Sequence, residues 1–376
     1  MSDTPPVVMK RGDSKPEETM LNHRTLTVEI EVLRDYMERL LRAVGVDDET
    51  SRTLAGIHLE SDLRGVSVQG FNHLISSHLN YYRHGHADPM AKPVVEQDGP
   101  SHALINGNDG PGPLAMLLAV ETAIAKVQSS GIGMVAVTNS HDSFHAGLYV
   151  EKVADAGFIA MMFSDDTVLV VHPHGGVEPN MGSNPMAWAV PTRGDPFVID
   201  FTPCATLPTY VRYTQRYDGE LAPGVAHDAA GNPASDPFAV ANGKGFQPDM
   251  GAIDPGGHRG FGMLMMIDFL SGAFADSDMG LAHVNKPGAV KGHMLMAFDP
   301  GLFGNSGFRD QVQARIDEVK ASKKAPGVDA IRMPGEGSAA RRRASLAAGE
   351  VTLDEILWQD GLKIGAELGV QPREQE

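Results

Sequence analysis

Two histidines and an aspartate follow a short apolar segment near the middle of the chain. Residues 134–139 read MVAVTN, a pattern typical of a buried β-strand, and Ser140 and His141 come directly after it. Asp142 and His145 follow, close enough along the chain to orient the His141 ring or raise its pKa. An imidazole that titrates near neutral pH can donate and accept a proton. We therefore expect general acid–base chemistry at this segment.

An arginine and a glutamine form a second candidate group. Arg64 follows a helix predicted from the capping residue Asp47 to about Leu63. A guanidinium can bind a carboxylate through two parallel hydrogen bonds, although a helix-end arginine can equally form a surface ion pair. Gln69 can form hydrogen bonds but cannot exchange a proton near neutral pH. This segment therefore favours substrate binding over proton transfer.

A metal site is the competing interpretation of the histidines. His172 and His174 flank a proline and, with His141 and His145, look like zinc ligands. Their spacing fits no standard structural zinc site, and the only cysteine, Cys204, takes no part. We predict that no metal is bound. A metal hydrolase would instead contain stoichiometric zinc and be sensitive to chelators.

The composition limits the class of partner. The net charge is −17, from 48 acidic and 31 basic residues, and the only dense basic run is residues 341–343. Binding of nucleic acid would need a basic stripe, so it is not expected. An acidic chain that binds an organic acid must concentrate positive potential locally, through backbone N–H groups and one or two arginines.

The ends and the cysteine content indicate a cytoplasmic protein. A single cysteine rules out a disulfide within the chain, and no run approaches the ~20 apolar residues that span a membrane. Residues 1–24 lack an apolar signal segment and are predicted to be a disordered leader.

The elements that must position these residues alternate irregularly between helix and strand. Apolar periodicity predicts helices at 28–44, 47–63, 113–129, 146–156, 260–274 and 308–322, and strands at 134–139, 158–163, 186–190, 197–201 and 294–298. The order indicates an α/β protein without a regular βαβ repeat. Residues 218–257, rich in Gly, Pro, Asp and Asn, are predicted to be a functional excursion.

One glycine-rich turn matches the pattern of a dinucleotide-binding fingerprint. Residues 110–115, GPGPLA, follow a short predicted strand and open a helix. The next predicted strand ends in Thr138 and Asn139, so no carboxylate is present to hold a ribose hydroxyl. We therefore predict a glycine turn that caps a helix, not a Rossmann fold.

Seven blocks, in order along residues 28–368, resemble the malate/L-lactate dehydrogenase family of the second type. The family includes ureidoglycolate and sulfolactate dehydrogenases, diketogulonate reductase and piperideine-2-carboxylate reductases. The blocks are DLRGV at 62–66 with Gly70 and Asn72, NSH at 139–141, MGSNP at 181–185, VIDFT at 198–202, GNP at 231–233 with Asp236 and Pro237, GHRGFG at 257–262, and RMPGE at 332–336.

The resemblance implies a fold and an activity. It implies a non-Rossmann NAD(P)-binding α/β fold with a helical N-terminal part, a homodimer, and hydride transfer without a metal. Residues 25–130 would form the helical, dimerising part, with 300–376 packing back on it, and 131–299 the NAD(P)-binding and substrate lobe. Arg64 would bind the substrate carboxylate. His141 would match the catalytic histidine of the ureidoglycolate dehydrogenase branch.

The chain departs from the family at the usual proton donor. Where the family reads Asp-Ser-His-Gly, this sequence has Ser67, Val68, Gln69 and Gly70. His141, then His145, then His73 are the candidates to replace the missing histidine, and a water relay is the remaining alternative. A further departure is arginine at 259, where the family more often has lysine.

The resemblance also implies the cofactor contacts, with NAD or NADP left open. The candidates lie on turns and loops whose main chain can approach a ligand closely. They are Ser140, Gly182, Ser183, Asn184, Asp200, Phe201, Thr202, His258, Gly335 and Glu336.

The predicted function is hydride transfer between nicotinamide and a small 2-oxo or 2-hydroxy acid or a cyclic 2-imino acid. An imine that binds already protonated needs no strong acid, so the missing histidine adds weight to the imine substrates. The alternative is a dimeric family member that binds cofactor or ligand without turnover.

Overall fold

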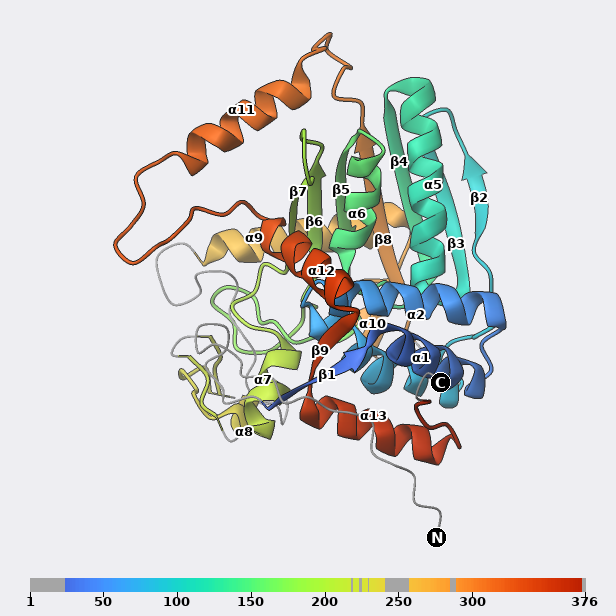
Figure 1. Cartoon of the computed structure of the whole chain (residues 1–376). Helices are drawn as coiled ribbons and strands as arrows, with labels where there is room; N and C mark the ends of the chain where they lie inside the picture. Colours follow the sequence, from blue (N-terminus) through green and yellow to red (C-terminus); the bar gives the residue numbers. More distant parts are fainter. Residues whose placement is uncertain are drawn as a thin grey trace. The chain divides into compact units, whose positions relative to one another are not determined.

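A seven-stranded sheet organises the larger part of the chain. The computed structural model (Figure 1) describes residues 24–373 apart from 218, 223–224, 229, 241–256 and 285–288. Contacts divide the chain into a first unit, residues 1–90 and 338–376, and a second unit, residues 91–337. The predicted leader lies outside the described residues except for Arg24.

The first unit is built from helices and a two-stranded ribbon. Strands β1 and β9 pair antiparallel. Its elements are β1 (Thr25–Glu29), α1 (Ile30–Ala43), α2 (Asp48–Leu63), η1 (Ser67–Gln69), α3 (Phe71–His73), the π-helix η2 (Leu74–His78), α4 (Leu79–Arg83), β9 (Glu350–Asp354) and α13 (Glu355–Glu367). Helix α12 (Glu336–Ala348) begins two residues before this unit resumes.

The sequence explains most of these helices. In α1 the buried residues Leu33, Met37, Leu40 and Leu41 recur at helical spacing. Asp47 caps α2, because its carboxylate accepts hydrogen bonds from the N–H groups of Glu49 and Thr50. The helix start predicted at residue 28 is wrong, since residues up to Glu29 pair with β9 and the helix begins at Ile30.

The second unit holds the seven-stranded sheet, in the order β2-β3-β4-β8-β5-β6-β7. Its elements are β2 (Val94–Asp98), β3 (His102–Gly110), α5 (Gly112–Ser130), β4 (Ile132–Ser140), α6 (Ala146–Asp155), β5 (Ile159–Ser164), β6 (Met186–Val190), β7 (Phe197–Phe201), α7 (Pro208–Arg216), α8 (Pro237–Ala239), α9 (His258–Ser271), η4 (Ala273–Ala275), α10 (Leu281–Val284), β8 (Lys291–Phe298) and α11 (Phe308–Lys320).

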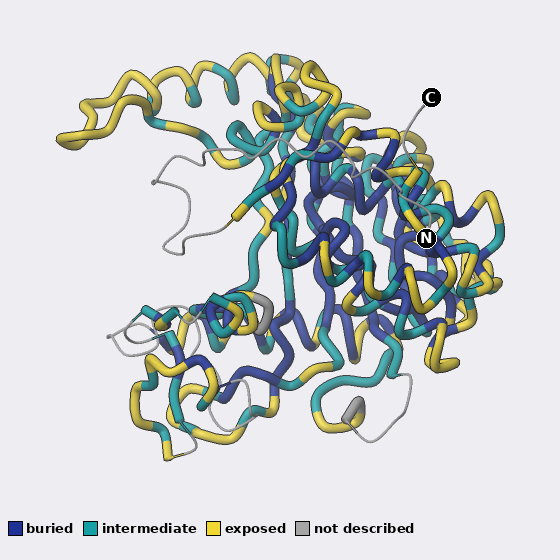
Figure 2. Tube along the Cα trace, turned by 60° about the horizontal axis from the view of Figure 1, so that its bottom comes forward, coloured by how far each residue is buried: buried dark blue, intermediate teal, exposed yellow. Residues whose placement is uncertain are grey.

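Helices cover the two faces of this sheet, as Figure 1 shows. Met162 and Leu295 pack with α5 and α6, whereas their neighbours Phe163 and Met294 pack with Ile267 of α9. Successive side chains of a strand point to opposite faces, so α5 and α6 lie on one face and α9 on the other. The central strands and the inner faces of α5 and α6 carry many of the buried residues, which are dark blue in Figure 2.

The sheet is not the parallel sheet of a Rossmann fold, in agreement with the prediction. Strands β3 and β4 pair in parallel, and the other pairs of the sheet are antiparallel. Gly112 is required for packing, since a Cβ there would lie 2.2 Å from the carbonyl oxygen of His141. The glycine turn at 110–115 therefore brings the start of α5 against the His141 segment.

The predicted helices and strands of the second unit are largely confirmed, with shifts of up to three residues at their ends. Strands 186–190 and 197–201 match β6 and β7 at both ends. The division predicted at residue 130 differs from the one that the contacts give. Strand β3 and α5 belong with the sheet, because β3 pairs with β4 and α5 contributes to the core of the same unit.

Candidate active site

Three strands of the second unit end at the His141 segment. Ser140, the last residue of β4, pairs with Gly110 of β3 and with Lys291 of β8. The side chain of Ser140 is buried, and its hydroxyl donates to the carbonyl oxygen of His141. The strand order thus gathers residues that lie far apart in sequence around one imidazole.

His141 is buried and faces an aspartate from β3. Its Nε2 lies 2.8 Å from Oδ1 of Asp109, whose side chain is 52% exposed. Burial lowers the pKa of His141, while Asp109 raises it, Lys291 lowers it and Asp142 raises it, in decreasing order of effect. The sequence predicted that Asp142 and His145 could orient the ring or raise its pKa. Asp142 does raise the pKa, but the net direction is downward and the hydrogen-bond partner is Asp109.

The backbone at this place is strained. Among the described residues, six other than glycine have positive φ, and five of them lie around the site: Asn108, Asp109, Asn139, Phe144 and Asn184. Phe144, with φ of 63°, is the most unusual, because a bulky aromatic residue rarely adopts this region. Such strain concentrates where a particular side-chain placement is needed.

His145 has a different carboxylate as its neighbour. Its Nε2 lies 3.7 Å from Oδ2 of Asp200 on β7, and the same oxygen accepts a hydrogen bond from the N–H of Gly147 at 2.6 Å. Burial raises the pKa of Asp200 to about 6. Asp200, predicted as a cofactor contact, therefore serves the first turn of α6 and lies beside His145.

The turn of residues 182–184 uses its side chains within the protein. Ser183 donates to Oδ2 of Asp166 at 2.7 Å, and Asn184 donates to the carbonyl oxygen of Leu264 and to Asp268. Gly182 is required here, since a Cβ would lie 2.5 Å from that of Asp166. A ligand at this turn would therefore meet main-chain groups.

The other predicted cofactor residues lie in three places: after β7, at the start of α9 and on the loop before α12. Phe201 is packed partly buried, and Thr202 contacts Cys204, whose pKa burial raises to about 11. His258 is an exposed residue at the start of α9.

Gly335 and Glu336 lie on the loop that precedes α12. Gly335 has φ of 88°, and a Cβ there would lie 3.2 Å from the backbone nitrogen of Val198. Glu336 pairs with Lys320 at 2.6 Å, which lowers the pKa of the Glu336 carboxyl.

Arg64 lies in the first unit, at the C-terminal end of α2. Its side chain is 12% exposed, and Nε lies 3.5 Å from Oε2 of Glu60. Arg342 holds the same carboxylate with two hydrogen bonds of 2.7 and 2.9 Å, and Arg341 donates to the carbonyl oxygen of Arg64. Glu60 thus accepts two hydrogen bonds from Arg342 and also lies beside Arg64.

The segment that follows Arg64 is held by α2. Nδ1 of His58 lies 3.1 Å from the carbonyl oxygen of Gln69, and the N–H of Phe71 donates to Oδ2 of Asp62 at 2.8 Å. A Cβ at Gly70 would lie 2.0 Å from Oδ1 of Asp62, so only glycine fits. Burial raises the pKa of Asp62 to about 8, which makes this carboxyl protonated at neutral pH.

His73 belongs to a cluster of three histidines in the first unit. Its ring stacks on His58 with 6.5 Å between centroids and contacts His78 edge-on. Of the three candidates for proton transfer, His73 belongs to the first unit, and His141 and His145 belong to the second.

Two of the four histidines considered as metal ligands, His172 and His174, each lie beside a histidine outside that set. Nε2 of His172 lies 3.2 Å from Nδ1 of His227, and the rings of His174 and His258 are 6.1 Å apart. Among the described residues, no group of three or more His, Cys, Asp or Glu side chains has a geometry that could hold a metal ion.

Three residues of this region were missed by the sequence analysis. Asp109, Asp166 and Lys291 lie at strand ends, and each is joined to another strand or loop. The weak signal for Lys291 is a charged residue three positions before the apolar segment 294–298. For Asp109 it is an aspartate just before the Gly-Pro-Gly turn.

Comparison with known proteins agrees with the resemblance. The sequence profile of the malate/L-lactate dehydrogenase family matches residues 28–360. Malate dehydrogenase of Pyrococcus horikoshii is 30% identical over 309 residues, which cover 81% of this chain and 85% of that protein. L-sulfolactate dehydrogenase of Methanothermobacter thermautotrophicus is 30% identical over 344 residues, 89% of this chain and 95% of that protein.

A more distant relative and a solved structure extend the comparison. The Delta(1)-pyrroline-2-carboxylate/Delta(1)-piperideine-2-carboxylate reductase of Pseudomonas putida is 27% identical over 338 residues, covering 88% of this chain and 94% of that protein. The solved structure of the P. horikoshii malate dehydrogenase superposes with a TM-score of 0.84 at 26% identity and covers 95% of this chain and 99% of that one.

The fold and the sequence define a nicotinamide-dependent oxidoreductase of the non-Rossmann α/β type. The chain belongs to the malate/L-lactate dehydrogenase family. In the described part of the chain, no helix combines the length and apolarity that a membrane crossing requires.

Proposed function

We propose that this protein transfers a hydride between NAD or NADP and a small 2-oxo or 2-hydroxy acid or a cyclic 2-imino acid, with His141 as the proton donor and acceptor. The observation that carries the proposal is the buried His141 held at 2.8 Å by Asp109, in a member of this family. An aspartate on one ring nitrogen fixes the tautomer and the ring orientation, as a histidine that transfers protons requires.

The role of His141 differs between the two directions. In reduction, His141 would give a proton to the nascent alkoxide or amine while hydride arrives at carbon. In oxidation, it would take the proton from the hydroxyl or ammonium group. Asp109 stabilises the imidazolium that oxidation creates, whereas burial and Lys291 favour the neutral ring. Because these effects on the pKa of His141 oppose one another, the ring can act as proton donor in reduction and as proton acceptor in oxidation.

Arg64 is proposed to bind the substrate carboxylate. Its guanidinium is largely buried, and a guanidinium can bind a carboxylate through two parallel hydrogen bonds. Gln69 is proposed as a hydrogen-bonding residue, and His145, beside Asp200, as the second candidate for proton transfer.

The chain fits a dinucleotide through its main chain. A Cβ at Gly262, the fifth residue of α9, would meet no described atom within 4 Å. Backbone N–H groups at a helix start favour a phosphate. The turn at 182–184, Ser140, the 200–202 segment, His258, Gly335 and Glu336 are proposed to complete the site. When bound, the cofactor supplies or accepts the hydride.

Imino acids are proposed as substrates alongside 2-oxo acids. Gln69 stands where the family usually has its histidine, and burial lowers the pKa of His141, which favours the neutral ring. A protonated imine needs no proton at nitrogen before hydride arrives. A relative from P. putida is named as a reductase of two cyclic imino acids.

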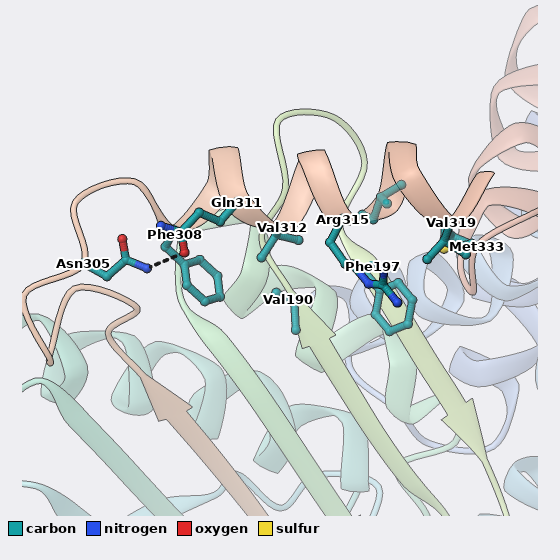
Figure 3. A pocket seen from close by; sticks show the side chains of 10 residues that line it. Val190, Phe197, Asn305, Phe308, Gln311, Val312, Arg315, Val319 and Met333 are labelled. Carbon is teal, nitrogen blue, oxygen red and sulfur yellow. Dashed lines mark hydrogen bonds between the residues drawn. The ribbon is translucent and has the colours of Figure 1, made fainter. Parts of the chain in front are cut away.

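We also propose a cytoplasmic homodimer, with the second unit as the cofactor-binding lobe. Helix α11 has no buried residue, and its apolar side chains line a cavity of about 560 Å³ together with Val190 and Phe197 of β6 and β7 (Figure 3). Phe303, just before this helix, is 95% exposed. A second copy would remove this apolar surface from water, and Ile316→Asp should yield monomers in sedimentation. The single cysteine supports a reducing compartment.

The deciding experiment is a panel of 2-oxo acids with NADH and NADPH, each run with and without ammonia or methylamine. We expect turnover of at least one carboxylate substrate, and amine dependence if an imine is reduced. Binding of reduced nucleotide without turnover over the whole panel would contradict the proposed activity. Absence of nucleotide binding would contradict the cofactor assignment as well.

A further inference from the structure

Lys291, the first residue of β8, is a buried lysine with two carboxylate partners. It is 7% exposed, and its Nζ lies 3.0 Å from Oδ1 of Asp166 and 3.3 Å from Oδ2 of Asp142. Removing an ammonium group from water is costly unless it is paired, so these contacts determine where the side chain can lie.

The two carboxylates come from different segments of the proposed site. Asp142 follows His141 directly, and Asp166 follows β5 and accepts the hydroxyl hydrogen bond of Ser183 at 2.7 Å. One ammonium group therefore ties the His141 segment to the 182–184 turn.

The main chain of β8 holds Lys291 in place. Gly292 donates to Oδ1 of Asp165 at 2.8 Å, and a Cβ at Gly292 would lie 1.8 Å from the carbonyl oxygen of Ser271. His293 has Nε2 3.3 Å from the carbonyl oxygen of His141 and Nδ1 2.8 Å from Oγ of Ser164. Residues 292 and 293 of β8 are thus held by hydrogen bonds to the end of β5 and to the His141 segment, which fixes the start of β8 next to both carboxylate partners of Lys291.

We infer that Lys291 is a positioning residue for the proposed reaction: it joins the His141 segment to the 182–184 turn and places a fixed positive charge beside His141. The inference rests on the proposed function, because Lys291 acts on substrate only through His141. Nothing in its position requires contact with substrate or cofactor.

The charges that face His141 predict the direction in which its pKa should shift when one of them is removed. Asp109 of β3 and Asp142 favour the imidazolium, and Lys291 favours the neutral ring. His293 is neutral above acidic pH, since burial lowers its pKa to about 4. Removing the lysine charge should therefore raise the pKa of His141, and removing the Asp142 charge should lower it.

The test is an NMR titration of His141 in the protein without cofactor or substrate. The Cε1–H signal is assigned with His141→Gln and followed from pH 4.5 to 9. We expect Lys291→Met to raise the pKa of His141 by about 0.5 or more, and Asp142→Asn to lower it by a similar amount. Lys291→Arg, which keeps the charge, should stay near the wild-type value.

Lys126 provides a matched control. It is also a buried lysine of the second unit, 8% exposed and paired with one carboxylate, that of Asp98. Lys126→Met should lower the melting temperature to a similar degree and leave the pKa of His141 unchanged.

The opposite signs separate a charge effect from a loosened structure. Burial is the main cause of the lowered pKa of His141, so a loosened segment would raise the pKa in both Lys291→Met and Asp142→Asn. An unchanged pKa in Lys291→Met, or a rise in Asp142→Asn, would overturn the inference. If Lys291→Met does not fold, Asp142→Asn carries the test and should lower the pKa of His141.

The titration is independent of the proposed activity. It needs neither nucleotide nor substrate, so a shifted pKa in a protein that turns over no 2-oxo or imino acid would support the electrostatic role and contradict the function. The reverse result would leave the activity standing and remove Lys291 from its mechanism.

Discussion

Replacing Asp109 by asparagine tests the partner of His141 most directly. The substitution keeps an oxygen 2.8 Å from Nε2 but removes the negative charge. The imidazolium loses stabilisation, whereas the neutral ring can still donate its hydrogen bond. The pKa of His141 should therefore fall below its wild-type value.

The magnitude follows from the exposure of the pair. A hydrogen bond to a charged group contributes ~1.5–3 kcal/mol when well protected and an exposed ion pair ~0.2–1 kcal/mol. The Asp109 side chain is 52% exposed, so we take about 1 kcal/mol. At 1.36 kcal/mol per pKa unit, this lowers the pKa of His141 by about 0.7, or about fivefold in proton affinity.

The assay is the pH dependence of kcat/KM for reduction of a 2-oxo acid, followed by loss of NADH or NADPH absorbance from pH 5 to 9. Reduction requires protonated His141, so the rate falls as pH rises through its pKa. In Asp109→Asn this fall should begin at lower pH. At pH values above the pKa of His141, kcat/KM of the variant should be about fivefold lower than that of wild type. High salt should move wild type toward the variant, because the pair is half exposed.

A matched control is Asp310→Asn, which removes an exposed carboxylate 2.7 Å from Arg193 in the same unit. It should leave the profile unchanged. The reasoning is refuted if Asp109→Asn folds normally and the fall of kcat/KM occurs at the same pH as in wild type or at a higher pH.

Three further predictions concern single substitutions. His141→Ala should lower kcat by about two orders of magnitude, and near-normal steady-state turnover would remove His141 from the mechanism. Arg64→Ala should raise KM for carboxylate substrates by about tenfold and leave NADH affinity unchanged, so equal kinetic constants would count against it. Asp62 has a pKa of about 8 in the fold against an ordinary 3.8, so wild type should lose stability as pH rises between these values. Asp62→Asn mimics the protonated carboxyl and should flatten the dependence of melting temperature on pH, whereas a parallel dependence in both proteins would contradict the buried neutral carboxyl.

The positions of most elements were predictable because apolar periodicity is a local property. Alternation in residues 186–190 and 197–201 and the cap at Asp47 depend on neighbours within a few positions, and all three match the structure. Strand β1 was missed because residues 25–29 acquire a strand partner only in β9, more than 300 residues away.

The candidate site divides in the same way. Arg64, His141 and the 182–184 turn could be named from sequence because they belong to blocks that resemble the family. The partners could not, because Asp109 lies 32 residues from His141, and Lys291 meets Asp142 and Asp166 across the sheet.

The sequence alone determined the family, the class of reaction and the loss of the usual histidine at Gln69. Only the tertiary structure decided which charges surround His141, because strand order places β3, β4 and β8 side by side. Proton affinity depends on burial and on charges a few ångströms away, and neither can be read from spacing along a chain.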